Sequence, residues 1–308
     1  MSSVSPASLP SASAAASART GALAATVCYL LWGIVPLYWK QLAHVDALEL
    51  IAHRHVWSLA LLLFLVVGQG ALPEVRAALG SVRSVALNVL SATLLTINWL
   101  IYVWGVNTGH VIECSLGYFL VPLVNVAVGR FVLHEHLRAL QWVAIASATA
   151  GVAWLIFQLG RPPWIALGLA SSWGAYSLMR KKSPLGSRTG LTVETLLLAP
   201  FALGFLLWRL RTGEGALGSS DAATHVLILS SGVITAIPLL LFAYGARRIR
   251  LSTLGLLQYV APSVQFALGI WLYREPFSRE KLVSFAFIWA GLVLYTVDNL
   301  LAQRRSLG

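Results

Sequence analysis

The stretch PLVNVAVGRFVLHE, residues 122–135, returns in outline as PSVQFALGIWLYRE at residues 262–275. A second match lies earlier in the sequence, where WGIVPLYWK from Trp32 aligns with WGAYSLMRKK from Trp173 at an offset of 141. Similarity at a fixed offset indicates an internal duplication. The pairs at an offset of 140, four identities and one amide-for-amide exchange, are Pro122/Pro262, Asn125/Gln265, Gly129/Gly269, Glu135/Glu275 and Gly151/Gly291.

The composition around these repeats is that of a membrane protein. The 308 residues are 58% hydrophobic and 11% charged, whereas soluble domains carry about 25% charged residues. A span needs about 20 mostly apolar residues. Scanning for such segments predicts ten spans and no inserted soluble domain, at residues 21–39, 47–67, 84–106, 111–133, 138–158, 163–180, 190–208, 223–246, 251–273 and 281–300.

Lys and Arg indicate how the chain is oriented. With the N-terminus inside, the inner segments carry 14 of these residues and the outer segments carry 7, with Arg54 left over. This bias places both termini in the cytoplasm. It also accounts for the net charge of +11 without a nucleic-acid partner.

The predicted fold is therefore an all-α polytopic membrane protein of ten transmembrane helices, arranged as two inverted five-helix repeats. Because five is odd, the second half enters the membrane from the opposite side, as in many secondary transporters. The predicted domains are a disordered Ser/Ala-rich cytoplasmic tail, two repeats and a short cytoplasmic tail, at residues 1–20, 21–158, 163–300 and 301–308.

Polar residues at membrane depth are candidates for a solute cavity, because burying them is costly unless they have partners. Pro122 and Pro262 each remove a backbone donor at equivalent positions, and interrupted helices of this kind mark the substrate site of many carriers. The alternative is hydrogen bonding between helices without a ligand. The predicted cavity residues are Trp32, Asn98, Tyr102, Tyr118, Pro122, Asn125, Gln258, Tyr259, Pro262 and Gln265.

Arg54 opens the second span between His53 and His55. It is either a functional cation or a side chain that extends back to the outer water. The carboxylate predicted at its depth is Glu113, so we expect an Arg54–Glu113 pair at the outer mouth. At the inner mouth we expect Glu194 to pair with Arg250 or Lys181. These gating charges would stabilise alternate closed states, and Glu113 or Glu194 could also carry a coupling proton.

Several motifs point away from other functions. Glu135 and Glu275 lie in tight turns and are expected to serve helix-end chemistry. HEH at residues 134–136 lacks the spacing of a zinc helix. No phosphate loop, nucleophile elbow or paired carboxylate is present, so we predict no catalytic residue, metal or cofactor, and no enzyme.

Five motifs carry a resemblance to a known family. YLLWGIVPLYWK (29–40), ELIAHRHVWS (49–58), NWLIYVWGVNTGHVIECSLGYFLVPLVNV (98–126), LSTLGLLQYVAPSVQF (251–266) and REPFS (274–278) resemble the RarD-type transporters of the EamA group, in the drug/metabolite transporter superfamily. The resemblance covers nearly the whole chain after the tail. It implies a ten-helix carrier with a central cavity in an inner membrane.

The function expected from both arguments is secondary active transport of a small organic solute, drug or metabolite, with export as the favoured direction. A proton-coupled amino-acid or metabolite importer is the alternative, and a membrane-embedded lipid-modifying enzyme is a weaker one. The expected partners are a small-molecule solute and membrane lipid, with a proton as a candidate coupling ion. The solute and the oligomeric state are left open.

Overall fold

The computed structural model describes residues 12–108, 110–272 and 279–305. Every regular element in this part of the chain is helical, as the fold class predicts. The elements are α1 (Ala12–Gln41), α2 (Ala47–Gly68), α3 (Leu72–Gly80), α4 (Val82–Asn107), α5 (Val111–Ala127), a π-helical turn η1 (Val128–Val132), α6 (Ala139–Leu159), α7 (Trp164–Lys182), α8 (Ser187–Arg211), α9 (Ala216–Ser219), α10 (Ala222–Ala246), α11 (Leu251–Leu257), α12 (Val260–Trp271) and α13 (Arg279–Arg305).

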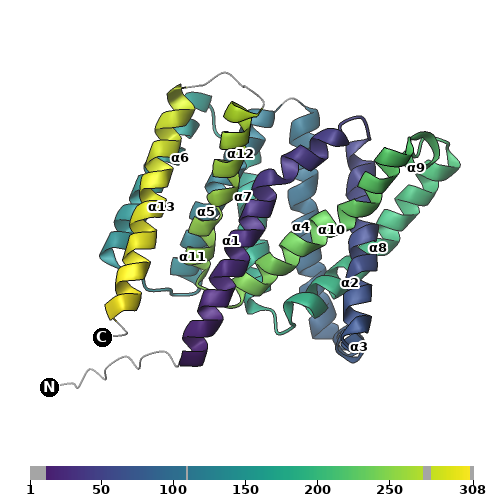
Figure 1. The fold of residues 1–308 in the computed structure, drawn as a ribbon, viewed down its shortest axis with the longest axis horizontal. Coiled ribbons are helices and arrows are strands. Elements are labelled where there is room, and N and C mark those ends of the chain that lie inside the picture. Colours follow the sequence, from purple (N-terminus) through teal and green to yellow (C-terminus); the bar gives the residue numbers. More distant parts are fainter. Residues whose placement is uncertain (1–11, 109, 273–278, 306–308) are drawn as a thin grey trace.

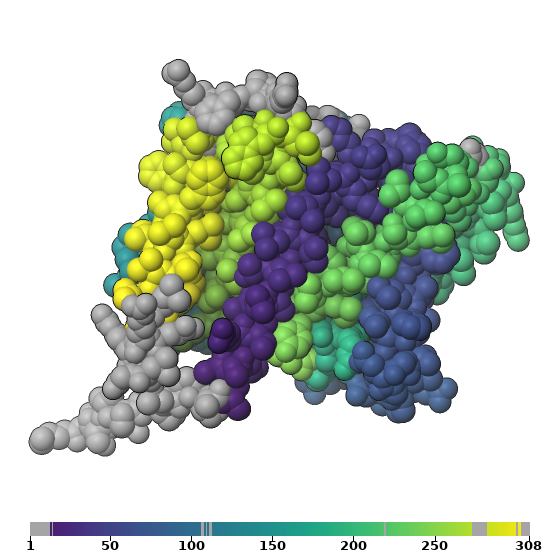
Figure 2. Space-filling view, in the orientation of Figure 1, coloured from purple at the N-terminus to yellow at the C-terminus, as the bar shows by residue number. Residues whose placement is uncertain are grey.

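The long helices form one bundle (Figure 1). α6 and α13 pack together at one edge, α3, α8 and α9 lie at the other, and α1 packs against both α10 and α12 between them. The same face in Figure 2 has α1 crossing it diagonally. The start of α1 and the end of α13 lie at one end of the bundle, here called the terminal side, and the 42–46 and 212–221 turns lie at the opposite end, the far side.

Capping residues mark the boundaries of several helices. The carboxylate of Asp46 accepts a hydrogen bond from the backbone N–H of Glu49 at 3.0 Å, and Asp221 does the same for Thr224 at 2.9 Å. These bonds satisfy donors that a helix N-terminus leaves open. Gly160 ends α6 with φ of 68°, a backbone conformation that suits glycine.

Nine helices in the described part of the chain have the length and hydropathy of membrane spans. The tenth predicted span, 163–180, corresponds to α7, which falls outside this set. α7 contributes buried polar residues, including Ser172, Ser177 and Arg180. It contacts α4 and α5, so its polar side chains meet protein rather than lipid. Its low hydropathy therefore reflects a central position in the bundle.

Reciprocal contacts confirm the duplication. A Cβ added to Gly151 in α6 would lie 2.6 Å from the carbonyl oxygen of Ser284 in α13. A Cβ added to Gly291 in α13 would lie 2.5 Å from the carbonyl oxygen of Ala144 in α6. Residues 144/284 and 151/291 are both 140 apart, so each helix presents the same surface to the other, as in a two-fold interface. The conserved offset of these glycines thus has a packing cause.

The helices that contain the equivalent prolines Pro122 and Pro262 differ in continuity. In the second half the helix breaks between α11 and α12 at Gln258 and Tyr259, because the ring of Pro262 excludes the carbonyl four residues earlier. In the first half α5 continues through Pro122 and passes into η1. The prediction of matching interruptions is therefore correct for Pro262 and wrong for Pro122, where the helix absorbs the proline.

The N-terminal boundary also needs correction. α1 begins at Ala12, so residues 12–20 are helical rather than disordered. Their Ala-rich sequence has high helix propensity, which the compositional argument for a tail overlooked. Residues 1–11, like Glu275 and residues 306–308, lie outside the described residues.

Candidate functional site

A cavity of about 530 Å³ occupies the middle of the bundle and extends toward the far side. It is lined by residues of α1, α2, α4, α5, α7, α10, α11/α12 and their junctions. The far-side ends of α1 and α2 contribute Trp39, Lys40 and Leu50, whereas the deepest lining residues include Trp173 and Leu239. Its size is that of a site for one small molecule.

Seven of the ten predicted cavity residues line this space. They come from five helical segments and are Trp32, Asn98, Tyr102, Tyr118, Gln258, Pro262 and Gln265. Asn98 is anchored, because its amide donates to the carbonyl oxygen of Leu169 at 2.8 Å and to the hydroxyl of Ser172 at 3.0 Å. The Tyr102 and Tyr118 rings meet edge to face, with centroids 5.8 Å apart.

The other three residues, Pro122, Asn125 and Tyr259, join the two halves behind the cavity. Asn125 is fully buried, and its amide donates to the side-chain oxygen of Gln258 at 3.2 Å. The hydroxyl of Tyr259 donates to the carbonyl oxygen of Phe119, which lies 140 residues away, at 3.1 Å. For these residues, hydrogen bonding between helices describes the structure better than contact with a solute.

Arg54 lies in the cavity wall. Its guanidinium carbon is 3.5 Å from the centroid of the Trp99 ring and 5.8 Å from that of Trp39. The flanking histidines point elsewhere: His53 lies 3.5 Å from the Glu49 carboxylate. His55 lies 3.2 Å from the carbonyl oxygen of Thr195 in α8. The three side chains therefore separate around the helix, and the arginine alone faces the cavity.

The predicted Arg54–Glu113 pair is wrong. The Glu113 carboxylate accepts from Arg161 at 3.0 Å and from the backbone N–H of Ile165 at 2.7 Å. It thereby neutralises an arginine of the α6–α7 turn and caps the first turn of α7. The depth argument placed Glu113 correctly on the far side but did not account for a cation in the neighbouring turn.

The predicted partners of Glu194 are also wrong. Glu194 accepts from Arg180 at 3.0 Å and from the hydroxyl of Tyr176 at 3.4 Å, and both members of the ion pair are almost fully buried. Arg250 instead donates to the carbonyl oxygen of His136 at 3.0 Å. Lys181 donates to the carbonyl oxygens of Ala246 and Ile249. These contacts fasten the terminal side of the bundle.

Glu135 serves helix-end chemistry, as predicted. Its carboxylate accepts from the backbone N–H groups of Leu251 and Ser252, at 2.6 and 3.0 Å, and from the Ser252 hydroxyl at 2.6 Å. It therefore caps α11 from the opposite half of the chain.

An aromatic cluster closes the cavity on the terminal side. Trp32 and Trp173, which line the cavity, have ring centroids 5.3 Å apart. Phe242 lies 5.3 Å from Trp173 and stacks on Tyr176 at 6.0 Å. Phe242 and Tyr176 are fully buried, so this cluster is packed against neighbouring helices and not against solvent.

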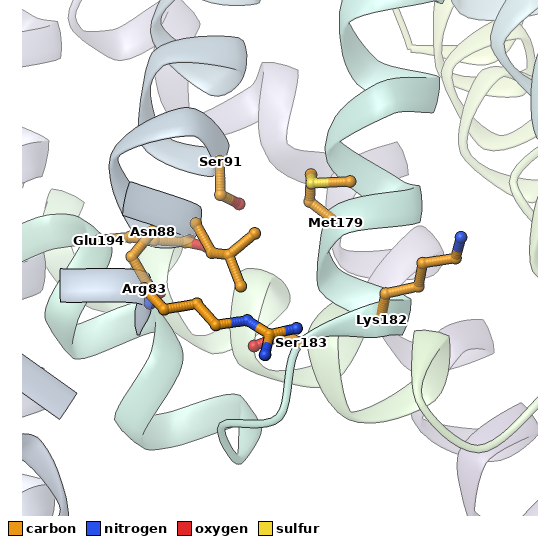
Figure 3. A pocket seen from close by; sticks show the side chains of 8 residues that line it. Arg83, Asn88, Ser91, Met179, Lys182, Ser183 and Glu194 are labelled. Carbon is orange, nitrogen blue, oxygen red and sulfur yellow. The ribbon is translucent and has the colours of Figure 1, made fainter. Parts of the chain in front are cut away.

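A second pocket, of about 410 Å³, lies between the terminal-side ends of α4 and α7 (Figure 3). It is distinct in lining from the cavity and brings Glu194 near cationic and small polar side chains. The lining residues are Arg83, Leu87, Asn88, Ser91, Met179, Lys182, Ser183 and Glu194.

Sequence reasoning missed Trp173 as a cavity residue and Arg161 and Arg180 as ion-pair partners. Trp173 could have been found, because it is the repeat equivalent of the predicted residue Trp32. The two arginines gave no comparable signal, since Arg180 belongs to the RKK cluster at 180–182 and Arg161 is a single cation in a turn. The orientation count accounts for both without a partner.

Comparisons with known proteins agree with this architecture. A model of the EamA-like transporter family matches residues 19–157 and 162–297, one copy for each half. A solved crystal structure with 19% sequence identity superposes with a TM-score of 0.68, covering 90% of this chain and 97% of that one. At that identity the likeness shows the fold alone.

Relatives of higher identity carry the names RarD or uncharacterized transporter. The chain is 42% identical to Protein RarD of Streptomyces exfoliatus, covering 94% of this chain and 91% of the relative. It is 41% identical to the uncharacterized transporter YojE of Bacillus subtilis (strain 168), covering 94% and 98%. It is 37% identical to Protein RarD of Escherichia coli (strain K12), covering 94% and 97%.

The paired halves, the central cavity and the near full-length similarity to these relatives all indicate the same family. The chain belongs to the EamA-like transporter family, as a RarD-type multi-pass inner-membrane transporter.

Proposed function

We propose that this protein is a secondary active exporter of a small organic solute, drug or metabolite, and that it works by alternating access of its two inverted repeats. The observation that carries the proposal is the unequal exposure of equivalent residues. The two halves share a sequence pattern and a packing surface, and both line the cavity, yet several equivalent positions differ in exposure.

Two pairs of residues 140 positions apart show this difference in exposure. Tyr118 is 42% exposed, whereas Gln258, 140 residues later, is 7% exposed. Tyr102 is 38% exposed, whereas Phe242, again 140 residues later, is fully buried. If the halves exchanged conformations, Phe242 would gain exposure on the terminal side and Tyr102 would lose it. Inverted repeats supply such an exchange without a new fold.

The orientation is part of the proposal. With both termini in the cytoplasm, as the excess of Lys and Arg in the inner segments favours, the cavity opens outward. The structure would then be the releasing state of an exporter, closed inside by the aromatic cluster and by the Arg180–Glu194 ion pair. An importer would bind its solute in this same state, so only flux measurements separate the two directions.

The energy source for transport can be tested together with the direction of transport. Coupling through a proton would require Glu113 or Glu194 to leave its arginine partner during the cycle. Reconstituted vesicles with an imposed pH gradient test this requirement. A gradient that drives solute flux, and a flux lost in Glu113→Gln or Glu194→Gln, would support proton coupling.

Cysteine accessibility tests alternating access. In a background with Cys28→Ala and Cys114→Ala, Tyr102→Cys should react with a membrane-impermeant maleimide from the outside. Phe242→Cys should react only from the inside, and only when conditions allow turnover. A solute found by thermal-shift screening should change the two labelling rates in opposite directions.

Counterflow in vesicles completes the test. A stabilising solute should exchange across the membrane, and Leu62→Cys, buried away from the cavity in the α2 core, should stay unlabelled throughout. If no stabilising solute exchanges, or if Phe242→Cys never reacts from the inside, the carrier proposal fails.

A further inference from the structure

The charge of the cavity points to the chemistry of its solute. The lining contains two cations, Lys40 and Arg54, and no aspartate or glutamate among the described residues. Elsewhere in the described chain, Arg180 pairs with Glu194 and Arg161 with Glu113. Arg54 forms no ion pair within 4 Å in this part of the chain.

The available carboxylates cannot readily move to neutralise Arg54. Glu113 is held by Arg161 and by the backbone of Ile165. Glu49, the other buried carboxylate of the far side, accepts from Arg209 at 3.3 Å and from the backbone N–H of Ala216 at 2.6 Å. Removing either carboxylate from these donors would leave a helix terminus or another arginine without its partner.

The stacking of Arg54 leaves the guanidinium able to bind an anion. The guanidinium carbon of Arg54 lies over the Trp99 ring, and such a contact stabilises the cation without cancelling its charge. The Nη groups project in the plane of the group, where a carboxylate binds through two parallel hydrogen bonds. The Nε atom is buried and has no hydrogen-bond partner, so the tryptophan contact orients the side chain without consuming its donors.

The remaining walls suit an apolar body. Trp32, Trp173, Val121, Leu169 and Leu239 line the deeper cavity. A solute with its charge at Arg54 would extend its apolar part toward these residues. An organic cation would meet the same apolar walls, but it would also meet the positive charge of Arg54, and no aspartate or glutamate of the described residues lines the cavity to compensate it.

We propose that the solute is an organic monoanion, a carboxylate with an apolar or aromatic body, whose carboxylate binds the Arg54 guanidinium. This inference rests on the proposed function for its biological role and names the substrate class of that same cavity. Arg54 thereby acquires a role in solute recognition in place of the gating role predicted from the sequence.

The test compares solutes that differ in charge and share a shape. Full-length protein in nanodiscs is titrated with 3-phenylpropionate, 3-phenylpropionamide and 3-phenylpropylamine, and with octanoate, octanamide and octylamine. At least one carboxylate should bind about tenfold or more tightly than its amide, the effect expected of one charge-assisted hydrogen-bonding partner. Its amine should bind no better than the amide.

Variants identify the group responsible. Arg54→Gln should reduce carboxylate affinity about tenfold or more, to that of the amide, and leave amide affinity unchanged. Arg54→Lys should retain part of the preference. Arg211→Gln, which removes an exposed arginine at the far-side end of α8, should bind all probes as the unmodified protein does.

Two results would overturn the inference. One is the absence of a carboxylate preference in both series, a comparison that needs no variant and so does not depend on folding of Arg54→Gln. The other is an equal loss of all three probes in Arg54→Gln and Arg54→Lys, which would mark a structural role. Counterflow of amides or amines without charge preference would refute the anion inference while leaving the carrier function intact; no counterflow of any stabilising solute would refute the carrier.

Discussion

At the scale of single residues, the buried charges of Arg180 and Glu194 form a closed local arrangement. The side chains of Arg180 and Glu194 are 1% and 3% exposed. Each buried charge is therefore compensated by the other. The Tyr176 hydroxyl adds a second donor to the carboxylate. Truncating one member of such a pair strands the other, whereas replacing both with apolar residues removes the desolvation cost.

We therefore predict an asymmetry between single and double substitutions. Glu194→Leu should destabilise the protein by about 3–5 kcal/mol, the usual cost of an uncompensated buried charge. The Arg180→Met/Glu194→Leu double variant should recover most of that loss. Thermal unfolding in one detergent measures both. A double variant less stable than the single one would mean that the pair contributes net stability.

The Glu113–Arg161 pair should behave differently, because its members are unequally buried. The Glu113 side chain is 4% exposed and also caps α7, whereas Arg161 is 54% exposed. Glu113→Ala should cost about 1–3 kcal/mol through the lost cap and unsatisfied donors. Arg161→Ala should cost at most about 1 kcal/mol, as for exposed ion pairs. Equal losses in thermal unfolding would show that the ion pair, rather than the cap, is the stabilising contact.

At the scale of elements, close contacts between helices depend on small residues. Without a hydrophobic driving force between helices in lipid, association relies on close packing, and glycine permits the nearest approach. α6 and α13 meet through Gly151 and Gly291 in a reciprocal contact. A methyl group at either position would push against the backbone of the partner helix.

Equivalent substitutions should therefore have equivalent costs. Gly151→Ala and Gly291→Ala should each lose about 1–3 kcal/mol by overpacking, within error of one another. Gly204→Ala in α8 is the control, since nothing lies within 4 Å of an added Cβ there, and it should be neutral or slightly stabilising. Melting temperatures of the three variants measure these changes in stability. A large difference between the first two would contradict the symmetry of the interface.

Much at this scale could be predicted from the sequence. The offset of 140 residues identified the duplication, because both halves keep the residues that their common packing requires. The search for polar and aromatic residues at membrane depth found seven cavity residues, since a polar face on an apolar helix must meet a cavity or another helix. The partners of Glu113 and Glu194 could not be predicted in this way. They depend on the reach of long side chains from a turn and from a helix end, which spacing along one helix does not encode.

At the scale of the whole molecule, the terminal side and the far side of the bundle are closed to different extents. The terminal side is closed by aromatic rings, by the Arg180–Glu194 pair and by Lys181 bound to carbonyl oxygens of the α10–α11 region. The far side carries the open cavity, where Arg54 forms no ion pair with any described residue. Within the described part of the chain the lining has no acidic residue, so a positive charge lies where an outward-bound solute would be released.

The proposed charge of the solute has a consequence for energetics. A membrane potential of 100 mV, inside negative, favours exit of a monovalent anion by about 2.3 kcal/mol, roughly a fiftyfold concentration ratio at equilibrium. Export of an organic monoanion could therefore proceed without a coupling proton. The same potential would oppose its import, so the inferred solute class favours export over uptake.

Vesicles with a potassium diffusion potential test this prediction. For a carboxylate that exchanges in counterflow, an inside-negative potential set with valinomycin should accelerate efflux, and an inside-positive potential should slow it. Flux of the matched neutral amide, where it is transported, should not respond to the potential, because it carries no charge. Arg54→Gln should lower carboxylate efflux at both potentials, while Arg211→Gln should leave it unchanged. If carboxylate flux ignores the potential and follows an imposed pH gradient, the anion moves together with a proton, and the carboxylates of Glu113 and Glu194 return as its candidate carriers.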